Sequence, residues 1–255
     1  MRTFEKTVGQ NAFPFTNNIL SSNIRDYRDL NNNNGVHMEL LNSIDWYLTK
    51  INNAQAALLK TPPPAEIEHL RFNHGVYIES IFSLIDYMHD SKNSISEDIK
   101  TIIGSDLFYF RTLRNSIVHR GFDLSTRGIV VNGNTRVSTP DNVTYKEELL
   151  PTPAEPLLLK ATMLLDIVMR SMLIQKLNSL GALDEKEIDE DIGFKKHCSL
   201  IENDKHIPLF AKEMYMQNIE EIRKAMDFTK INKDIINNLK DKLSLCNILI
   251  SFSTI

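Results

Sequence analysis

Apolar residues recur at three- and four-residue intervals over most of this chain, and proline and glycine interrupt the intervals at widely separated points. Such spacing places apolar side chains on one face of an α-helix. A run from 36 to 60 ends before three consecutive prolines, which cannot continue the helical hydrogen-bond ladder. Further runs cover about 65–89, 105–120 and 153–180. The sequence therefore predicts an all-α fold, built as an up-down helical bundle.

The predicted helices differ in how much of their surface is apolar. The segment 65–89 carries two apolar stripes, which indicates a central helix packed on several sides. The segment 153–180 is apolar almost all the way round, so it lies either in the bundle centre or partly in a dimer interface. A β signal interrupts this pattern near 128–138, where β-branched residues flank Asn132-Gly133, a pair that favours a tight hairpin.

These patterns divide the chain into three parts. Residues 1–35 have weak periodicity and are expected to form a loosely structured N-terminal arm. Residues 36–181 form the main helical domain, with the hairpin near 128–138 inserted in it. Residues 182–255 are expected to add a C-terminal layer of accessory helices. The acidic run at 184–191 is either a solvated face or an element that shields a basic patch.

Composition limits the classes of protein that fit. The chain of 255 residues has a formal net charge of −4, so any nucleic acid must be bound by a local basic patch rather than by the whole surface. Cys198 and Cys246 are too few for a disulfide framework. Charged residues interrupt the most apolar segment, 157–177, and the N-terminus lacks an apolar leader core. A soluble, cytoplasmic protein without a membrane segment is expected.

The segment 108–122 gathers groups that could carry out chemistry. Four of them fall within two helical turns: Arg114, Asn115, His119 and Arg120. Gly121 follows, where a left-handed helix C-cap is expected. Asn115 and His119 are four residues apart and share a helix face, so the amide could orient the imidazole. Arg114 and His119 are about 140° apart around the axis, so they meet at one target only if two copies of the helix face each other across a two-fold axis.

The residue types at these positions suit RNA cleavage. Arginine offers a planar fork for a phosphate and for the charge that develops on a phosphorane. Histidine titrates near neutral pH and can move a proton to or from a reacting oxygen. Arg114 and His119 therefore fit metal-independent cleavage, in which a ribose 2′-hydroxyl attacks the adjacent phosphodiester. The structural alternative is that Arg114 and Arg120 pair with surface acids while His119 only caps a helix end.

The run Arg114-Asn-Ser-Ile-Val-His119, continued by Arg120, resembles the Arg-x4-6-His signature of HEPN domains. The resemblance covers about residues 36–180 and implies a helical bundle, usually dimeric. Many members are metal-independent endoribonucleases that act as toxins or in antiviral defence, with an active site built from both subunits. By motif position, Arg114 and His119 would be the catalytic pair, Asn115 the polar residue after the arginine and Arg120 an added cationic contact. Gly121 stands where some family toxins carry tyrosine, which argues against that subgroup and its nucleotidyltransferase antidote.

Arginines around the motif extend the expected RNA contact. Between 111 and 127 the chain has four arginines against one acid, Asp123. Three of the arginines are expected to bind RNA: Arg111, Arg120 and Arg127. The hairpin near 128–138 either flanks the RNA path or covers the end of the bundle. Glu79, on the preceding helix, either supplies a polar contact in the cleft or pairs elsewhere.

No metal or other cofactor is expected. His69 and His74 are five residues apart, whereas metal ligands on one helix face lie three or four apart. The sequence predicts a homodimeric endoribonuclease whose target RNA and regulatory partner are left open. One alternative is a non-catalytic HEPN-like module that binds nucleotide, RNA or a partner protein. The other is a helical scaffold in which the motif is accidental.

Overall fold

The structure is a computed structural model in which the chain divides into two compact units. The larger unit is drawn from Ser43–Glu185 and Ile235–Ile255, and the smaller from Met1–Asn42 and Lys186–Asp234. The arm expected at 1–35 and the acidic run at 184–191 lie largely outside the described residues. The described residues are 34–60, 67–131, 133–184, 190–204, 207–245, 248–249 and 252.

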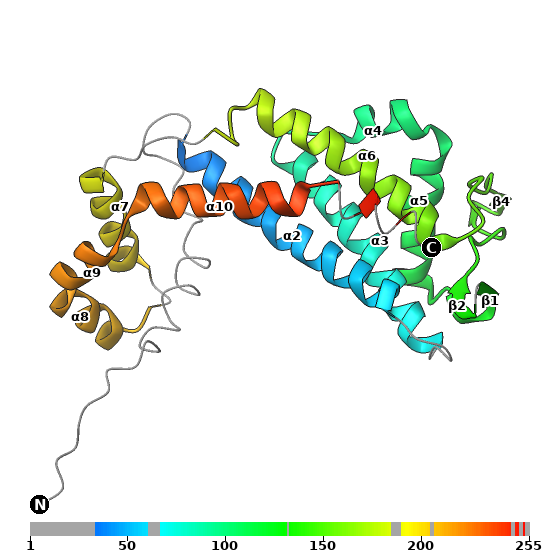
Figure 1. Cartoon of the computed structure of the whole chain (residues 1–255), viewed down its shortest axis with the longest axis horizontal. Helices are drawn as coiled ribbons and strands as arrows, with labels where there is room; N and C mark the ends of the chain where they lie inside the picture. The colour runs from blue at the N-terminus through cyan, green and yellow to red at the C-terminus, as the bar shows by residue number, and fades with distance from the viewer. Residues whose placement is uncertain are drawn as a thin grey trace, which may run out of the picture. The chain divides into compact units, whose positions relative to one another are not determined.

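The larger unit is mainly helical, which confirms the predicted all-α class. Its helices are most of α2 (Asn34–Lys60), α3 (Ile67–Asp90), α4 (Ser96–Ile103), α5 (Ser105–Arg120), α6 (Leu158–Ser179) and the last part of α10 (Phe228–Leu243) (Figure 1). The bounds of α5 are those expected from the sequence, because glycines with positive φ, Gly104 and Gly121, stand at its two ends. α6 begins later than predicted, since the chain at Leu157 is still extended.

α3 and α6 supply much of the core. Both predicted apolar stripes of α3 are buried, and Tyr77, Phe82 and Ile85 have no exposed surface. α6 is likewise buried on most sides, as its apolar composition indicates. Each of these fully buried large apolar side chains stabilises the fold by roughly 1.5–3 kcal/mol. α5 packs against α3 and α4.

A buried polar network joins four helices within this core. Arg170 is 1% exposed, and its Nε donates to Asp166 Oδ1 over 2.8 Å. Tyr77 Oη donates to the other oxygen of Asp166, at 2.9 Å. The remaining arginine nitrogens donate to Asn52 Oδ1 at 2.7 Å and to the backbone oxygen of Lys242, near the C-terminal end of α10. A cation at the carbonyl end of a helix is favourable, so Arg170 fastens α10 to α2, α3 and α6.

The predicted hairpin is present after α5. A short 3₁₀ helix, η2 (Leu124–Arg127), leads into β1 (Gly128–Val131), which pairs antiparallel with β2 (Asn134–Val137). Val131 pairs with Asn134, so the connection is the Asn-Gly pair singled out in the sequence, and Gly133 has a φ of 75°. A positive φ is what a two-residue hairpin turn requires, and glycine adopts it without strain.

A second hairpin was not predicted. The proline-containing connection after β2 contains β3 (Thr144–Tyr145), which pairs antiparallel with β4 (Glu148–Leu149). Its turn is formed by Lys146 and Glu147, whose φ angles are 49° and 70°. Neither residue type favours positive φ, so the sequence carried no turn signal.

The smaller unit contains α7 (Glu190–Asn203), α8 (Leu209–Gln217), α9 (Ile219–Ala225) and the start of α10. Asn218 separates α8 from α9. The Asp227 side chain accepts a hydrogen bond from the backbone N–H of Lys230 and caps α10. Among the described residues, no helix combines the length and apolarity needed to cross a bilayer.

Candidate functional site

The motif lies in the last two turns of α5. Six residues of the helix face the core: Leu107, Tyr109, Phe110, Thr112, Leu113 and Ser116. Gly121 is left-handed, with φ 63° and ψ 33°, and its N–H donates to Ser116 O, which confirms the predicted C-cap. The motif side chains therefore project from a fixed helix end on the side that the core does not occupy.

α3 runs antiparallel to α5 and pairs with it along a charged seam. A side chain at Gly75 would come within 3.4 Å of Ile117 Cγ2, so the two helices are close at this point. Two ion pairs join α3 to α5, Glu79–Arg114 and Asp86–Arg111, and a third, Arg71–Asp123, joins α3 to the residues just after α5. We call these three pairs and Gly75–Ile117 the α3–α5 seam. Its register sets which acids of α3 Arg111 and Arg114 meet.

Arg114 is held by Glu79 in a two-point contact. Its Nε donates to Glu79 Oε2 over 2.5 Å and its Nη2 to Oε1 over 3.1 Å. The arginine side chain is 20% exposed and the glutamate side chain 33%. Burial raises the pKa of Glu79, but hydrogen bonding and the positive charge of Arg114 outweigh it, so the pKa lies below its ordinary value. The Glu79 carboxylate thus stays ionised at neutral pH, and its two contacts fix the plane of the Arg114 guanidinium.

Asn115 has a different partner from the one expected. Its Oδ1 accepts a hydrogen bond from Arg114 Nη1 at 3.1 Å, and in the described structure no hydrogen bond joins it to His119. The amide therefore orients the arginine rather than the imidazole. His119 and Arg120 are both exposed at the end of α5 and have no hydrogen bond or ion pair with any described residue. Both are available to a ligand from solvent.

Two arginines expected to bind RNA already have acidic partners. Arg111 contacts Asp86 at 2.9 Å and lies over the Phe82 ring, 5.1 Å from its centroid. Arg127 Nη1 donates to Asp141 Oδ1 at 2.6 Å. Both partners come from other elements of the fold, so the local excess of arginine in the sequence overstates the positive charge of this surface. Arg120 is the motif cation that the described residues leave without an acid.

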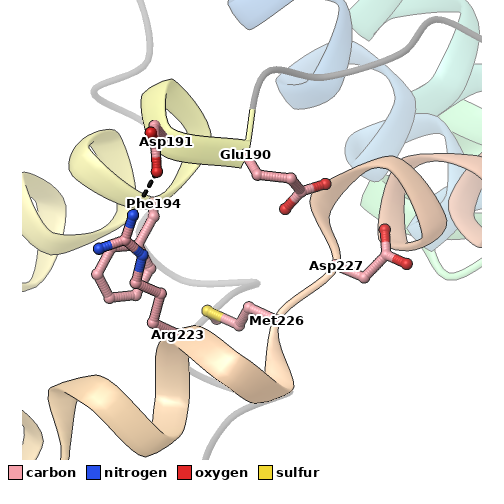
Figure 2. Close-up of a pocket in the computed structure, with 6 residues that line it drawn as sticks. All are labelled: Glu190, Asp191, Phe194, Arg223, Met226 and Asp227. Atoms are coloured by element: carbon pink, nitrogen blue, oxygen red, sulfur yellow. Dashed lines mark hydrogen bonds and ion pairs between the residues drawn. The ribbon is translucent and has the colours of Figure 1, made fainter.

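The smaller unit has an open hollow of about 470 Å³. Figure 2 shows its six lining residues: Glu190, Asp191, Phe194, Arg223, Met226 and Asp227. Arg223 lies over the Phe194 ring and pairs with Asp191. Glu190 Oε1 accepts from the backbone N–H of Thr229, and Asp227 caps the same helix start. These contacts explain the acids by helix capping and ion pairing, and no residue predicted to be functional lies here.

The described residues contain no group of three or more histidine, cysteine or acidic side chains placed to hold a metal ion. His69 is exposed, and its backbone oxygen accepts a hydrogen bond from Asn73 Nδ2 at 2.8 Å. His74 is buried, so the two imidazoles have different surroundings. No family model, no curated protein and no solved structure with which the chain was compared matches it.

Proposed function

We propose that the chain is a metal-independent endoribonuclease of HEPN type that works in the cytoplasm as a homodimer. The main observation in its support is the end of α5, where His119 and Arg120 are exposed and Arg114, about one turn earlier, is already oriented by Glu79. A pre-oriented guanidinium loses little freedom when it binds a phosphate, which favours it as a phosphorane-stabilising group. The helical larger unit is compatible with the up-down bundle of that family.

Each motif residue then has a role. His119 takes the proton of a ribose 2′-hydroxyl as its oxygen attacks the adjacent phosphorus. The bond from phosphorus to the 5′-oxygen breaks, and that oxygen takes up a proton, which leaves a 2′,3′-cyclic phosphate and a 5′-hydroxyl. Arg114 stabilises the charge on the phosphorane, and Asn115 holds Arg114 in place. Arg120 binds a flanking phosphate, while Arg111 and Arg127 contribute less because acids already neutralise them.

Self-pairing is needed because Arg114 and His119 diverge around one helix. Two large apolar side chains near this end of the α3–α5 seam support it: Phe72 is 68% exposed and Val118 is 48% exposed. A two-fold contact at this end of the seam would cover both side chains while bringing two motifs together. Val118→Asp should therefore reduce both dimerisation, measured by sedimentation, and cleavage.

A non-catalytic module that binds nucleotide, RNA or a partner protein is the second candidate. The Glu79–Arg114 contact favours it, because two of the guanidinium nitrogens that would hold a phosphate already donate to a carboxylate. In this case the ion pair serves the fold, and the exposed His119 and Arg120 serve binding alone.

Incubation with mixed RNA, with and without EDTA, separates the two candidates. The enzyme should leave 2′,3′-cyclic phosphate ends in both conditions. Arg114→Ala and His119→Ala should lower the rate by at least about 100-fold. His89→Ala, which removes an exposed histidine at the end of α3, is the matched control and should cleave normally. Wild-type cleavage by the His119 variant would contradict the proposal, and absence of cleavage by the dimeric wild type would favour the binding module.

A further inference from the structure

A pair of exposed aromatic rings lies beside the motif helix. Phe108, on α5, is 45% exposed, and Tyr145, on β3, is 42% exposed. Their ring centroids are 5.0 Å apart at an interplanar angle of 76°. The Lys146 ammonium lies 5.4 Å from the centroid of the tyrosine ring. We call Phe108, Tyr145 and Lys146 the aromatic platform.

The fold holds this platform in place. Val143, just before β3, is 1% exposed, and its backbone oxygen accepts from the N–H of Leu150. Tyr109, next to Phe108, donates its hydroxyl to Pro140 O at 2.6 Å and so ties α5 to the connection that leads to the hairpin. The turn keeps two non-glycine residues at positive φ, a strained conformation that persists only when its surroundings enforce it. The rings therefore stay exposed in a fixed position.

Phe108 and two of the motif residues, Asn115 and His119, share one line along α5. Phe108, Asn115 and His119 are separated by seven and four residues, which places all three within about 40° of one another around the helix axis. Along the axis, Phe108 and His119 are separated by about 16 Å. A strand of RNA lying on this face of α5 would pass over both.

We propose that the aromatic platform is a stacking subsite for an unpaired base of a single-stranded RNA. The proposal rests on the proposed function for the class of ligand. Bases in single strands stack on exposed aromatic side chains, whereas bases in a duplex are not available. The hairpin carries Lys146 against two carboxylates, Glu147 and Glu148, so it offers bases an aromatic surface and offers phosphates no net positive charge. Phosphate contact is left to Arg120, the residue that follows His119.

A protein partner fits this surface less well. A stable protein interface buries about 800 Å² on each side, with an apolar centre. Two partly exposed rings flanked by charged residues are far smaller than such a centre, but they match the dimensions of one or two bases. Stacking by itself is tolerant of sequence, so the subsite should bind any base and select for single strands.

The test uses the full chain with His119→Ala, which keeps the RNA intact, and a short fluorescein-labelled single-stranded RNA. Tyr145→Ala should weaken binding by about 5- to 100-fold, since stacking contributes on that scale per base. Tyr145→Phe, which keeps the ring, should restore binding. Leu149→Ala is the matched control, because Leu149 pairs with Thr144 and lies on the opposite face of the hairpin from Tyr145, although it is 64% exposed.

Salt dependence distinguishes stacking from charge. Tyr145→Ala should leave the slope of log affinity against log salt unchanged, whereas Arg120→Ala should reduce it by about 0.7, the value for one phosphate contact on a single strand. A duplex of the same sequence should compete poorly with the single strand. Photocrosslinking with 4-thiouridine RNA should label the peptides that contain Phe108 and Tyr145.

The outcomes separate this subsite from the proposed function. Unchanged RNA affinity in Tyr145→Ala overturns the subsite, even when wild-type cleavage shows that the nuclease proposal holds. Weaker binding in Tyr145→Ala, together with a wild type that never cleaves, supports the subsite and contradicts the nuclease. Equal competition by duplex overturns the subsite. A Tyr145→Ala variant that keeps its RNA affinity but no longer self-associates in sedimentation also overturns the subsite. The two rings would then belong to an interface between copies of the chain.

Discussion

Two arginine–carboxylate pairs in the larger unit have the same contact geometry and opposite surroundings. Arg170 and Arg114 each donate through Nε and Nη2 to a carboxylate. Arg170 is 1% exposed, and its remaining capacity is taken up by Asn52 and by the backbone oxygen of Lys242. Arg114 is 20% exposed, and within the described part of the chain its Nη1 donates only to the neighbouring Asn115.

This difference distinguishes an ion pair that only stabilises the fold from one whose arginine can bind a ligand. A buried pair whose donors are all used cannot exchange a partner without leaving a charge unsatisfied in the core. A pair at the surface can exchange its partner for a phosphate, because water solvates the carboxylate that is released. On this criterion Arg170 belongs to the fold and Arg114 is able to take part in chemistry.

Removing the buried cation should have the largest effect on stability. Arg170→Ala leaves Asp166 without its charge partner in the core, so we expect the free energy of unfolding to fall by about 3–5 kcal/mol in urea titrations followed by circular dichroism. The double variant Asp166→Leu with Arg170→Met removes both charges and should recover much of that loss. If Arg170→Ala lowered the free energy of unfolding by less than about 1 kcal/mol, the Asp166–Arg170 and Glu79–Arg114 pairs would not differ as argued above.

Removing the partly exposed carboxylate should affect stability much less. Glu79→Gln should lower the free energy of unfolding by about 1 kcal/mol or less, because solvent screens the pair. If Arg114 stabilises a phosphorane, loss of its fixed orientation should lower kcat by up to about 100-fold while KM changes little. A large rise in KM with unchanged kcat would instead assign Arg114 to ground-state binding.

The pH dependence of that small contribution should have a defined sign. The folded-state pKa of Glu79 lies below its ordinary value of 4.5, so the unfolded chain binds more protons over the interval between the two values. The stabilisation is therefore complete above about pH 4.5 and is lost as the pH falls through the folded-state pKa. Urea titrations of wild type and Glu79→Gln should differ at neutral pH and converge in acid. A difference that grows in acid would show that the carboxylate is not stabilised in the folded state.

The exposed end of the motif should affect stability least. His119→Ala and Arg120→Ala remove side chains with no described partner, so each should change the free energy of unfolding by no more than about 0.5 kcal/mol. Thermal melting of both variants checks this directly. A larger loss in either variant would assign that residue to the fold and remove it from the candidate site.

Helices were predictable from this sequence where a local signal defined them. α5 has its predicted bounds because Gly104 and Gly121 mark its ends, and β1–β2 formed where Asn-Gly separates two β-branched runs. The second hairpin was missed because its strands have two residues each and its turn uses Lys146 and Glu147. Tertiary contacts enforce that turn against local preference, and no local pattern reports them.

The candidate site was predictable in its residues but not in their partners. The sequence placed Arg114, Asn115 and His119 on one helix, where the structure also has them. It could not reveal that Glu79, thirty-five residues earlier, holds Arg114, because helix periodicity does not determine which helices pack together. The same limit applies to Arg111 and Arg127, whose acidic partners Asp86 and Asp141 come from other elements.

The hydrogen bond from Arg170 to the Lys242 backbone oxygen has a consequence for biosynthesis. The larger unit is discontinuous, and the ribosome makes all of Lys186–Asp234 before it reaches the helix end that Arg170 requires. Until then the Arg170 guanidinium lacks the Lys242 oxygen as an acceptor. Contacts between residues so far apart in the sequence also form slowly. Residues far downstream of the motif must therefore be translated before the core that supports α5 is complete.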